Sequence, residues 1–266
     1  MFSALVQGLK DLALKPSILL PAIVFVLFNA VLAALSQDTI LEFFYNVIFL
    51  EQLPYATNWV EFFYFFVMIY FWQLLALALV LFLAYTASFW MAFSYSAFVK
   101  NKGKTGAVAS STHALSRIGS AVSLAVFFGI VTLLYGFLLM VFFLLTSLPG
   151  ENIVGGLGLL LFLLWLVFGV YLLVKLLFLP YIVGVEESKT KNAVEKAWQW
   201  SGKHFFGIIV VSLIVGIIAN VIALAGSALS DFFGESLVAV AVVALFVSVS
   251  VAYSNLVFAH YYNSTR

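Results

Sequence analysis

The sequence predicts an all-α integral membrane protein with six transmembrane helices and no separate soluble domain. Of its 266 residues, 65% are hydrophobic and only 9% are charged, whereas soluble domains carry about 25% charged residues. Six apolar runs reach the ~20 residues that a helix needs to cross the hydrocarbon core. They are too long and uniformly apolar for barrel strands. A single domain, 1–266, is predicted, with spans at 17–36, 60–98, 119–147, 157–184, 205–229 and 236–260.

The charged residues separate by sign between the two sides of the predicted membrane. The loops on one side carry only acids: Asp38, Glu42, Glu51, Glu61, Glu151, Asp231 and Glu235. The other side carries Lys10, Lys15, Lys100, Lys102, Lys104, Arg117, Lys189, Lys191, Lys196, Lys203 and Arg266. Because positively charged loops stay in the cytoplasm, both termini are predicted to be cytoplasmic, in a protein of the cell membrane.

Four shorter segments are predicted to lie along the membrane surface. Residues 2–14, 105–118 and 190–203 place apolar side chains on one helical face, so they are expected as amphipathic helices in the cytoplasmic headgroup layer. Residues 38–53, rich in aromatic and aliphatic side chains, are expected in the outer interface. A re-entrant pore loop is the alternative for this segment, but it lacks the glycines of such filters.

The second span is longer than a bilayer is thick. Residues 60–99 contain neither Gly nor Pro, so a single helix of about 60 Å is predicted, twice the hydrocarbon thickness. Its second half, YTASFWMAFSYSAFV, would project into the cytoplasm although it is too apolar to face water. We therefore expect a cytoplasmic collar, in which the amphipathic helices cover the projecting ends of inward-running helices.

An internal repeat with an offset of 86 residues supports this arrangement. Tyr85 aligns with Tyr171, Tyr95 with Tyr181, and Arg117 with Lys203. Each unit comprises an inward span, an amphipathic helix and an outward span, and the two ends of the chain supply a third, broken copy. The sequence therefore predicts a pseudo-threefold ring of parallel helical hairpins, rather than the inverted repeat of many transporters.

The stretch FLPYIVGVEESKTKNAVEKAWQWSGKHFFGII resembles a superfamily of prokaryotic six-span membrane domains. This superfamily includes the membrane domain of some glycerophosphoryl diester phosphodiesterases and related domains of unknown function. The resemblance rests on Pro180, the acidic turn Glu186-Glu187, Ala193 with Ala197, and Lys203. It is clearest over 170–220 and looser over 85–135. The resemblance implies a lipid-associated membrane module. It does not imply phosphodiesterase activity, because the sequence contains no catalytic phosphodiesterase domain.

Several function classes are disfavoured by composition. The net charge of +1 gives no reason to expect nucleic acid, and the absence of Cys excludes disulfides and thiol ligands. No Ser-His-Asp set, HExxH, P-loop or paired intramembrane carboxylates occur. We therefore expect no enzymatic activity, no cofactor and no metal site. The lack of Cys, with few Asn and Gln, fits a thermophilic source.

Six residues are candidates for lipid or ligand contact. Lys15, Arg117 and Lys203 each stand where an amphipathic helix turns into an outward span. They either anchor the inner interface or bind anionic headgroups, with Lys196 and His204 assisting in one copy. Lys175 interrupts the apolar run LLVKLLFLPY. Its repeat partner is Phe89, so it is predicted at the base of the collar, facing the cytoplasmic vestibule.

Seven uncharged polar residues are candidates for lining a cavity. Tyr85, Tyr171 and Tyr253 occupy comparable places in the three units. The amides Asn29, Gln73, Asn220 and Asn255 lie inside spans. Core packing explains the tyrosines equally well, and hydrogen bonds between helices explain the amides.

The function predicted from these features is that of a non-enzymatic module engaging membrane lipids in organisation, sensing or assembly. Two alternatives stay open. One is a channel or carrier whose cavity opens to the cytoplasm, and the other is a subunit of a larger membrane complex. Membrane lipids are the expected partners, with a homo-oligomer or a membrane partner subunit as further options.

Overall fold

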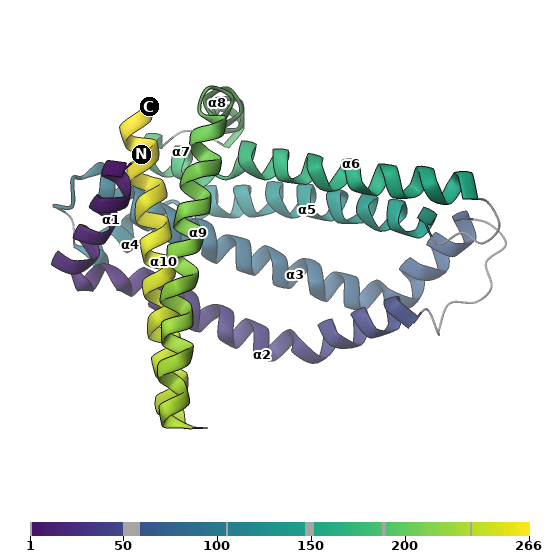
Figure 1. The fold of residues 1–266 in the computed structure, drawn as a ribbon, viewed down its shortest axis with the longest axis horizontal. Coiled ribbons are helices and arrows are strands. Elements are labelled where there is room, and N and C mark those ends of the chain that lie inside the picture. The colour runs from purple at the N-terminus through teal and green to yellow at the C-terminus, as the bar shows by residue number, and fades with distance from the viewer. Residues whose placement is uncertain (1, 50–58, 105, 147–151, 188–189, 235) are drawn as a thin grey trace.

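The computed structural model describes residues 2–49, 59–104, 106–146, 152–187, 190–234 and 236–266. These residues form helices, with no strand among them, and include six segments long and apolar enough to cross a membrane. The all-α membrane class is therefore confirmed. The long helices are α2 (Leu20–Phe49), α3 (Trp59–Lys100), α5 (Ile118–Thr146), α6 (Asn152–Leu176), α9 (Phe205–Ser230) and α10 (Leu237–Thr265) (Figure 1).

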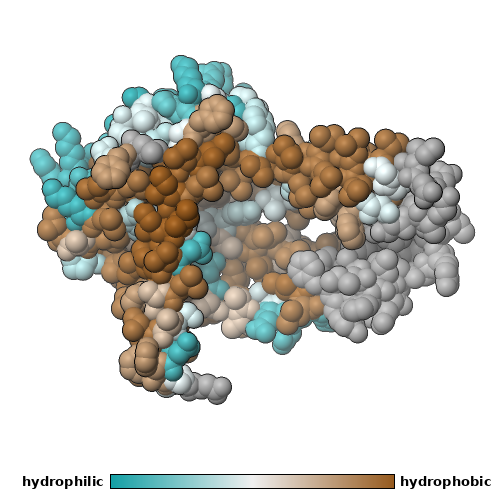
Figure 2. Space-filling model, in the orientation of Figure 1, coloured by the Kyte–Doolittle hydropathy of each residue, from teal (hydrophilic) through white to brown (hydrophobic). Residues whose placement is uncertain are grey.

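Shorter helices gather at one end of the molecule (Figure 1). They are α1 (Phe2–Leu14), η1 (Pro16–Leu19), α4 (Ala107–Leu115), α7 (Leu179–Glu186) and α8 (Thr190–Lys203), while η2 (Asp231–Phe233) follows α9. The helices α1, α4 and α8 fall within the three segments expected to be amphipathic. Hydrophilic side chains surround this end, and hydrophobic ones cover α6 and α9 (Figure 2).

The expected collar surrounds the last turns of α3. This helix runs uninterrupted through 42 residues, about 63 Å, and residues 91–99 are all buried. The ends of α3, α7 and α10 pack against one another, while α4 covers α3, α8 covers α7 and α1 covers α10. We use "collar" for α1, α4, α7 and α8 together with residues 89–100 and 248–265. Each of the three predicted repeat units contributes one long-helix end and one covering helix to the collar.

The fourth predicted span, 157–184, is not one continuous helix. The helix α6 ends at Leu176, and α7 begins at Leu179 after a short turn. Pro180 explains the break, because its ring has no N–H for the helix ladder and collides with the carbonyl four residues earlier. The repeat partner α3 carries Ser94 at this position and stays straight through it.

Outside the collar, the long helices do not all run in the same direction (Figure 1). Figure 1 shows α9 and α10 running across the direction of α2, α3, α5 and α6. The buried residues of α10 all lie from Ser248 onward. The part of α10 before Ser248 packs against α9, where Gly226 lies beside Phe246. The units also meet outside the collar, where α9 packs against α10, α5 against α6 and α2 against α3.

The segment 38–53 is predicted from the sequence as a separate helix on the membrane surface, but its described part belongs to a long helix. The helix α2 continues without interruption as far as Phe49, so residues 38–49 extend the first span. Residues 50–53 lie outside the described part of the chain.

The helices α3 and α7 approach each other closely at one glycine. A Cβ added to Gly184 would lie 2.6 Å from the Cβ of Ser96, and Ser96 is itself completely buried. Only a residue without a side chain permits this contact between two units of the collar.

Replacing Gly184 by Ala should therefore force α3 and α7 apart. Overpacking of this kind costs about 1–3 kcal/mol, so the melting temperature in detergent should fall. Gly216→Ala is the matched control, because a Cβ there meets nothing within 4 Å and alanine favours helix. Equal melting temperatures for the two variants would contradict this view of the collar.

Candidate functional site

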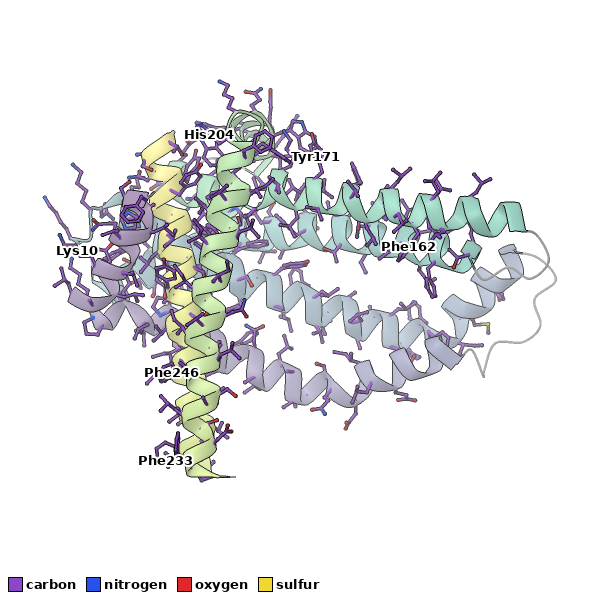
Figure 3. All side chains as sticks on the ribbon, viewed as in Figure 1. Lys10, Phe162, Tyr171, His204, Phe233 and Phe246 are labelled. Carbon is purple, nitrogen blue, oxygen red and sulfur yellow. The ribbon has the colours of Figure 1, made fainter. Side chains whose placement is uncertain are left out.

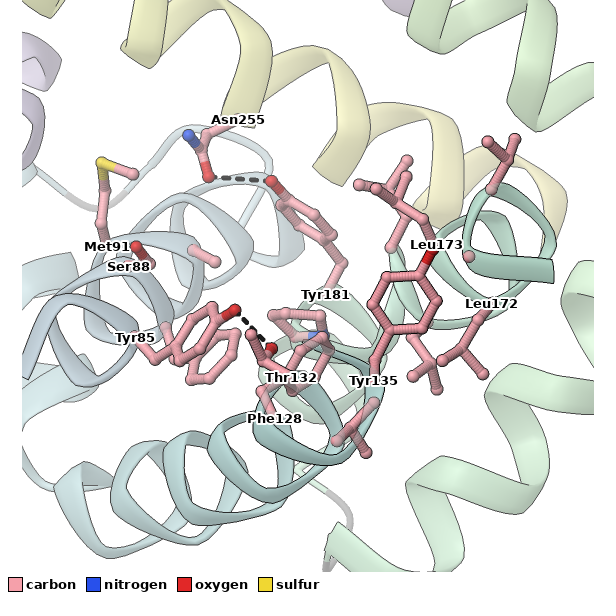
Figure 4. Close-up of a pocket in the computed structure, with 18 of the residues that line it drawn as sticks. Tyr85, Ser88, Met91, Phe128, Thr132, Tyr135, Leu172, Leu173, Tyr181 and Asn255 are labelled. Atoms are coloured by element: carbon pink, nitrogen blue, oxygen red, sulfur yellow. Dashed lines mark hydrogen bonds between the residues drawn. The ribbon is translucent and has the colours of Figure 1, made fainter. Parts of the chain in front are cut away.

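An apolar cavity of about 680 Å³ lies between α3, α5 and α6, next to the collar. Its walls are formed mainly by Leu, Val, Phe and Met side chains, and Pro180 and Tyr181 of α7 close it at the break after α6 (Figure 4). Val170 and Leu173, which belong to the lining, are more than 60% exposed. The cavity therefore opens sideways on the apolar surface. Its volume is within the size range of ligand pockets.

The polar groups of the cavity are uncharged and paired. The Tyr181 hydroxyl donates to Asn255 Oδ1 at 2.8 Å, and the hydroxyls of Tyr85 and Thr132 meet at 2.8 Å (Figure 4). Asn255 Nδ2 also donates to the Val251 carbonyl within its own helix. The Tyr135 hydroxyl donates to the Trp165 carbonyl. No Lys, Arg, Asp or Glu is among the described lining residues.

Two of the seven predicted cavity residues, Tyr85 and Asn255, line this cavity. Tyr171 packs instead against Trp198 of α8, and Tyr253 is buried against Gly8 of α1. The amides of Asn29 and Asn220 donate to carbonyls four residues earlier in their own helices. Gln73 is half-buried and does not line the cavity.

Sequence reasoning did not select Tyr181 and Thr132 as cavity residues. The alignment of Tyr95 with Tyr181 was a usable signal, because both hydroxyls form hydrogen bonds to another unit. Tyr95 donates to the Ile18 carbonyl at 3.0 Å, as Tyr181 does to Asn255. Thr132 has no comparable signal in the sequence.

Two of the three basic residues that the repeat aligns bind backbone carbonyls at the C-terminal end of a helix in another unit. Lys15 Nζ donates to the carbonyl of Gly103, just after α3. Arg117 donates to Val183 in the last turn of α7 at 2.8 Å. Carbonyls at helix C-termini lack helical partners and favour a nearby cation. These two residues therefore tie units together.

The third basic residue, Lys203, is exposed, and no such bond is recorded for it among the described residues. Lys196 pairs with Glu186 at 2.6 Å. His204 stacks on Trp200 at a centroid distance of 4.9 Å, beside α8 (Figure 3). Thus Lys15, Arg117 and Lys203 do not converge on one anion site.

Lys175 lies beneath α8 rather than facing a vestibule. Lys175 is 7% exposed, and its Nζ donates to the Trp198 carbonyl at 3.2 Å. The ammonium also lies 5.0 Å from the ring centroid of Trp198 and 5.5 Å from that of Tyr171, within the range of cation–π attraction. It holds α8 against the end of α6, on a different face of α6 from the cavity.

The acidic turn Glu186-Glu187 connects all three units. Glu186 accepts hydrogen bonds from Tyr262 of α10 and from Lys196 of α8. Glu187 accepts from Lys100 of α3 at 2.5 Å and lies 3.7 Å from His113 of α4. The hydrogen bond from Lys100 holds the pKa of Glu187 below its usual range.

Comparison with protein-family models, with curated proteins and with solved structures gave no match to this chain. The resemblance to the six-span membrane-domain superfamily therefore stays a prediction, and the argument for function rests on the geometry of the chain itself.

The position of Lys175 predicts that it anchors α8. In Lys175→Ala, α8 loses the hydrogen bond, both ring contacts and the lysine stem. Hydrogen exchange of 190–203, followed by mass spectrometry, should accelerate by about tenfold, the equivalent of ~1.4 kcal/mol of local stability. Lys203→Ala, on α8 itself but exposed, is the control and should exchange like the wild type. Unchanged exchange in Lys175→Ala would show that α8 docks without the lysine.

The pairing of Glu187 predicts a pH-dependent stability. A carboxyl with a depressed folded-state pKa stabilises the fold above its unfolded pKa of about 4.3 and loses this contribution as the pH falls through the folded pKa. Glu187→Gln should therefore lower the melting temperature slightly at neutral pH and leave it unchanged in strong acid. The side chain is 45% exposed, so solvent screening limits the effect to about 0.5 kcal/mol. Glu195→Gln, an exposed carboxylate on α8, should lack this pH-dependent difference.

Proposed function

We propose that this protein is a non-enzymatic, multi-pass membrane module that holds the hydrocarbon part of a membrane lipid in the cavity between α3, α5 and α6. The observation that carries the proposal is the combination of an apolar lining with an opening toward the apolar surface. An acyl or isoprenoid chain in the surrounding bilayer has direct access to such a cavity. Its entry fills space that would otherwise lose dispersion contacts.

The proposed orientation places the collar in the cytoplasm of a prokaryotic cell and the loops between the hairpin helices on the outer side of the cell membrane. The support is the charge distribution, because every basic residue lies in or next to the collar segments while the opposite loops carry acids alone. Both termini then lie on the cytoplasmic side, where α1 and the end of α10 meet (Figure 1).

The channel or carrier alternative receives less support from the lining. A path for ions or polar solutes needs polar or charged groups to replace lost hydration, whereas the described lining holds only paired hydroxyls and one amide. A subunit role in a larger complex is compatible with the same cavity. It would appear as a co-purifying membrane protein rather than as a change in bound lipid.

Filling the cavity tests the proposal. Val131 of α5 lines the cavity, whereas its neighbour Ile130 is 54% exposed and does not. Val131→Phe should reduce the lipid retained after detergent purification by on the order of tenfold, equal to ~1.4 kcal/mol. Ile130→Phe makes a similar change outside the cavity and should retain lipid like the wild type. Native mass spectrometry of the intact protein measures the retained lipid.

The outcome is interpretable only for folded variants, so both melting temperatures are measured alongside. A Val131→Phe protein that melts like the wild type and retains the same lipid would refute the cavity as the lipid site.

A further inference from the structure

The absence of charge among the described cavity residues has a consequence for the kind of lipid that enters. We propose that the cavity selects an uncharged lipid whose polar end is a free hydroxyl group, such as diacylglycerol or a polyprenol, and rejects phospholipids. This inference rests on the proposed function, because it concerns the head of the lipid whose chain fills the same cavity.

A phosphate group is an unfavourable occupant of this cavity. An anion placed among apolar side chains costs several kcal/mol unless a cation meets it. Two basic residues on elements that border the cavity or the collar are already engaged elsewhere. Lys175 faces the Trp198 carbonyl under α8, and Arg117 donates to the Val183 carbonyl in the collar. A phosphate in the described cavity would therefore have no counter-ion, whereas a neutral head avoids this cost.

The two polar pairs of the cavity keep unused hydrogen-bonding capacity. In the Tyr181–Asn255 pair, the tyrosine oxygen keeps free lone pairs after donating, and the Asn255 amide keeps one N–H beyond the bond to Val251. In the Tyr85–Thr132 pair, one hydroxyl hydrogen is not used between the two oxygens. A ligand hydroxyl both donates and accepts, so it matches the remaining donors and acceptors of either pair.

The location of the pairs is consistent with such a head. Tyr181 and Asn255 come from α7 and α10, where the collar closes the cavity, while the opening beside Val170 and Leu173 faces the apolar surface (Figure 4). A chain that enters from the side can thus place its hydroxyl at the inner, polar end and leave its tail toward the bilayer.

The test compares photoactivatable lipids with identical diazirine-labelled chains. The wild-type protein, in nanodiscs of phosphatidylcholine, is irradiated with labelled diacylglycerol or with labelled phosphatidylglycerol, and the cross-linked peptides are identified. Cross-links from diacylglycerol to α3, α5 and α6 should exceed those from phosphatidylglycerol by about tenfold or more, the equivalent of ≥1.4 kcal/mol. Equal labelling of the cavity by phosphatidylglycerol would overturn the selectivity.

Unlabelled competitors distinguish the two sources of the hydroxyl. Displacement by unlabelled diacylglycerol alone identifies that lipid, and displacement by unlabelled polyprenol identifies the isoprenoid alcohol. Displacement by neither would overturn the proposal, because labelling would then not report a saturable site for this class.

Variants test the hydrogen bonds. Tyr181→Phe and Tyr85→Phe should each lower diacylglycerol labelling by about fivefold, as expected for a hydrogen bond of ~1 kcal/mol. Tyr171→Phe is the matched control outside the cavity and should label like the wild type. If neither cavity variant changes the labelling while both melt like the wild type, the head-group argument fails.

A final variant adds a positive charge to the cavity and should shift its preference toward an anionic lipid. Ser88 lines the cavity on α3, so Ser88→Lys supplies the missing cation and should raise phosphatidylglycerol labelling relative to diacylglycerol. Labelling of both lipids that is insensitive to Val131→Phe would instead refute the proposed function. Sensitivity to Val131→Phe without discrimination between the lipids would refute this inference alone.

Discussion

Residues 91–99 of α3 are all buried although they extend beyond the length of helix that a bilayer can cover. Water cannot solvate this apolar surface favourably, so other parts of the chain must cover it. The ends of α7 and α10 cover one side and α4 another. Since α7 and α10 are apolar as well, they require α8 and α1 in turn. The collar is therefore a consequence of three helix ends, those of α3, α7 and α10, that share one apolar centre.

Polar bonds then fix the relative positions of the three units. The Glu186-Glu187 turn binds α3, α8 and α10, while Lys15 and Arg117 each bind a carbonyl of the neighbouring unit. In the third unit, a contact between α1 and α10 joins the two ends of the chain. There His260 of α10 meets Asp11 of α1 at 2.7 Å. These bonds lie at the collar, where partial access to water lowers the desolvation cost of charged groups.

The cavity lies beside the collar, at the break between α6 and α7. Pro180 separates α6 from α7, and the residues on both sides of the break close the cavity at the collar. An apolar space remains between α3, α5 and α6. Its uncharged lining follows from its position, since the basic residues nearby are used to hold collar helices together. The proposed lipid selectivity thus depends on the same contacts that stabilise the fold.

The length and composition of the apolar runs were sufficient to predict six long helices, because a chain in lipid must satisfy its backbone hydrogen bonds within each segment. The missing Gly and Pro in 60–99 predicted the 42-residue helix and its need for cover. Only the tertiary structure showed that Lys175 faces Trp198 and that Arg117 binds a carbonyl. Sequence spacing places a side chain on a helical face, but its partner belongs to another helix. The cavity, like the crossing of α9 and α10 over the other hairpins, depends on how helices meet in space, and one chain's local pattern does not encode that directly.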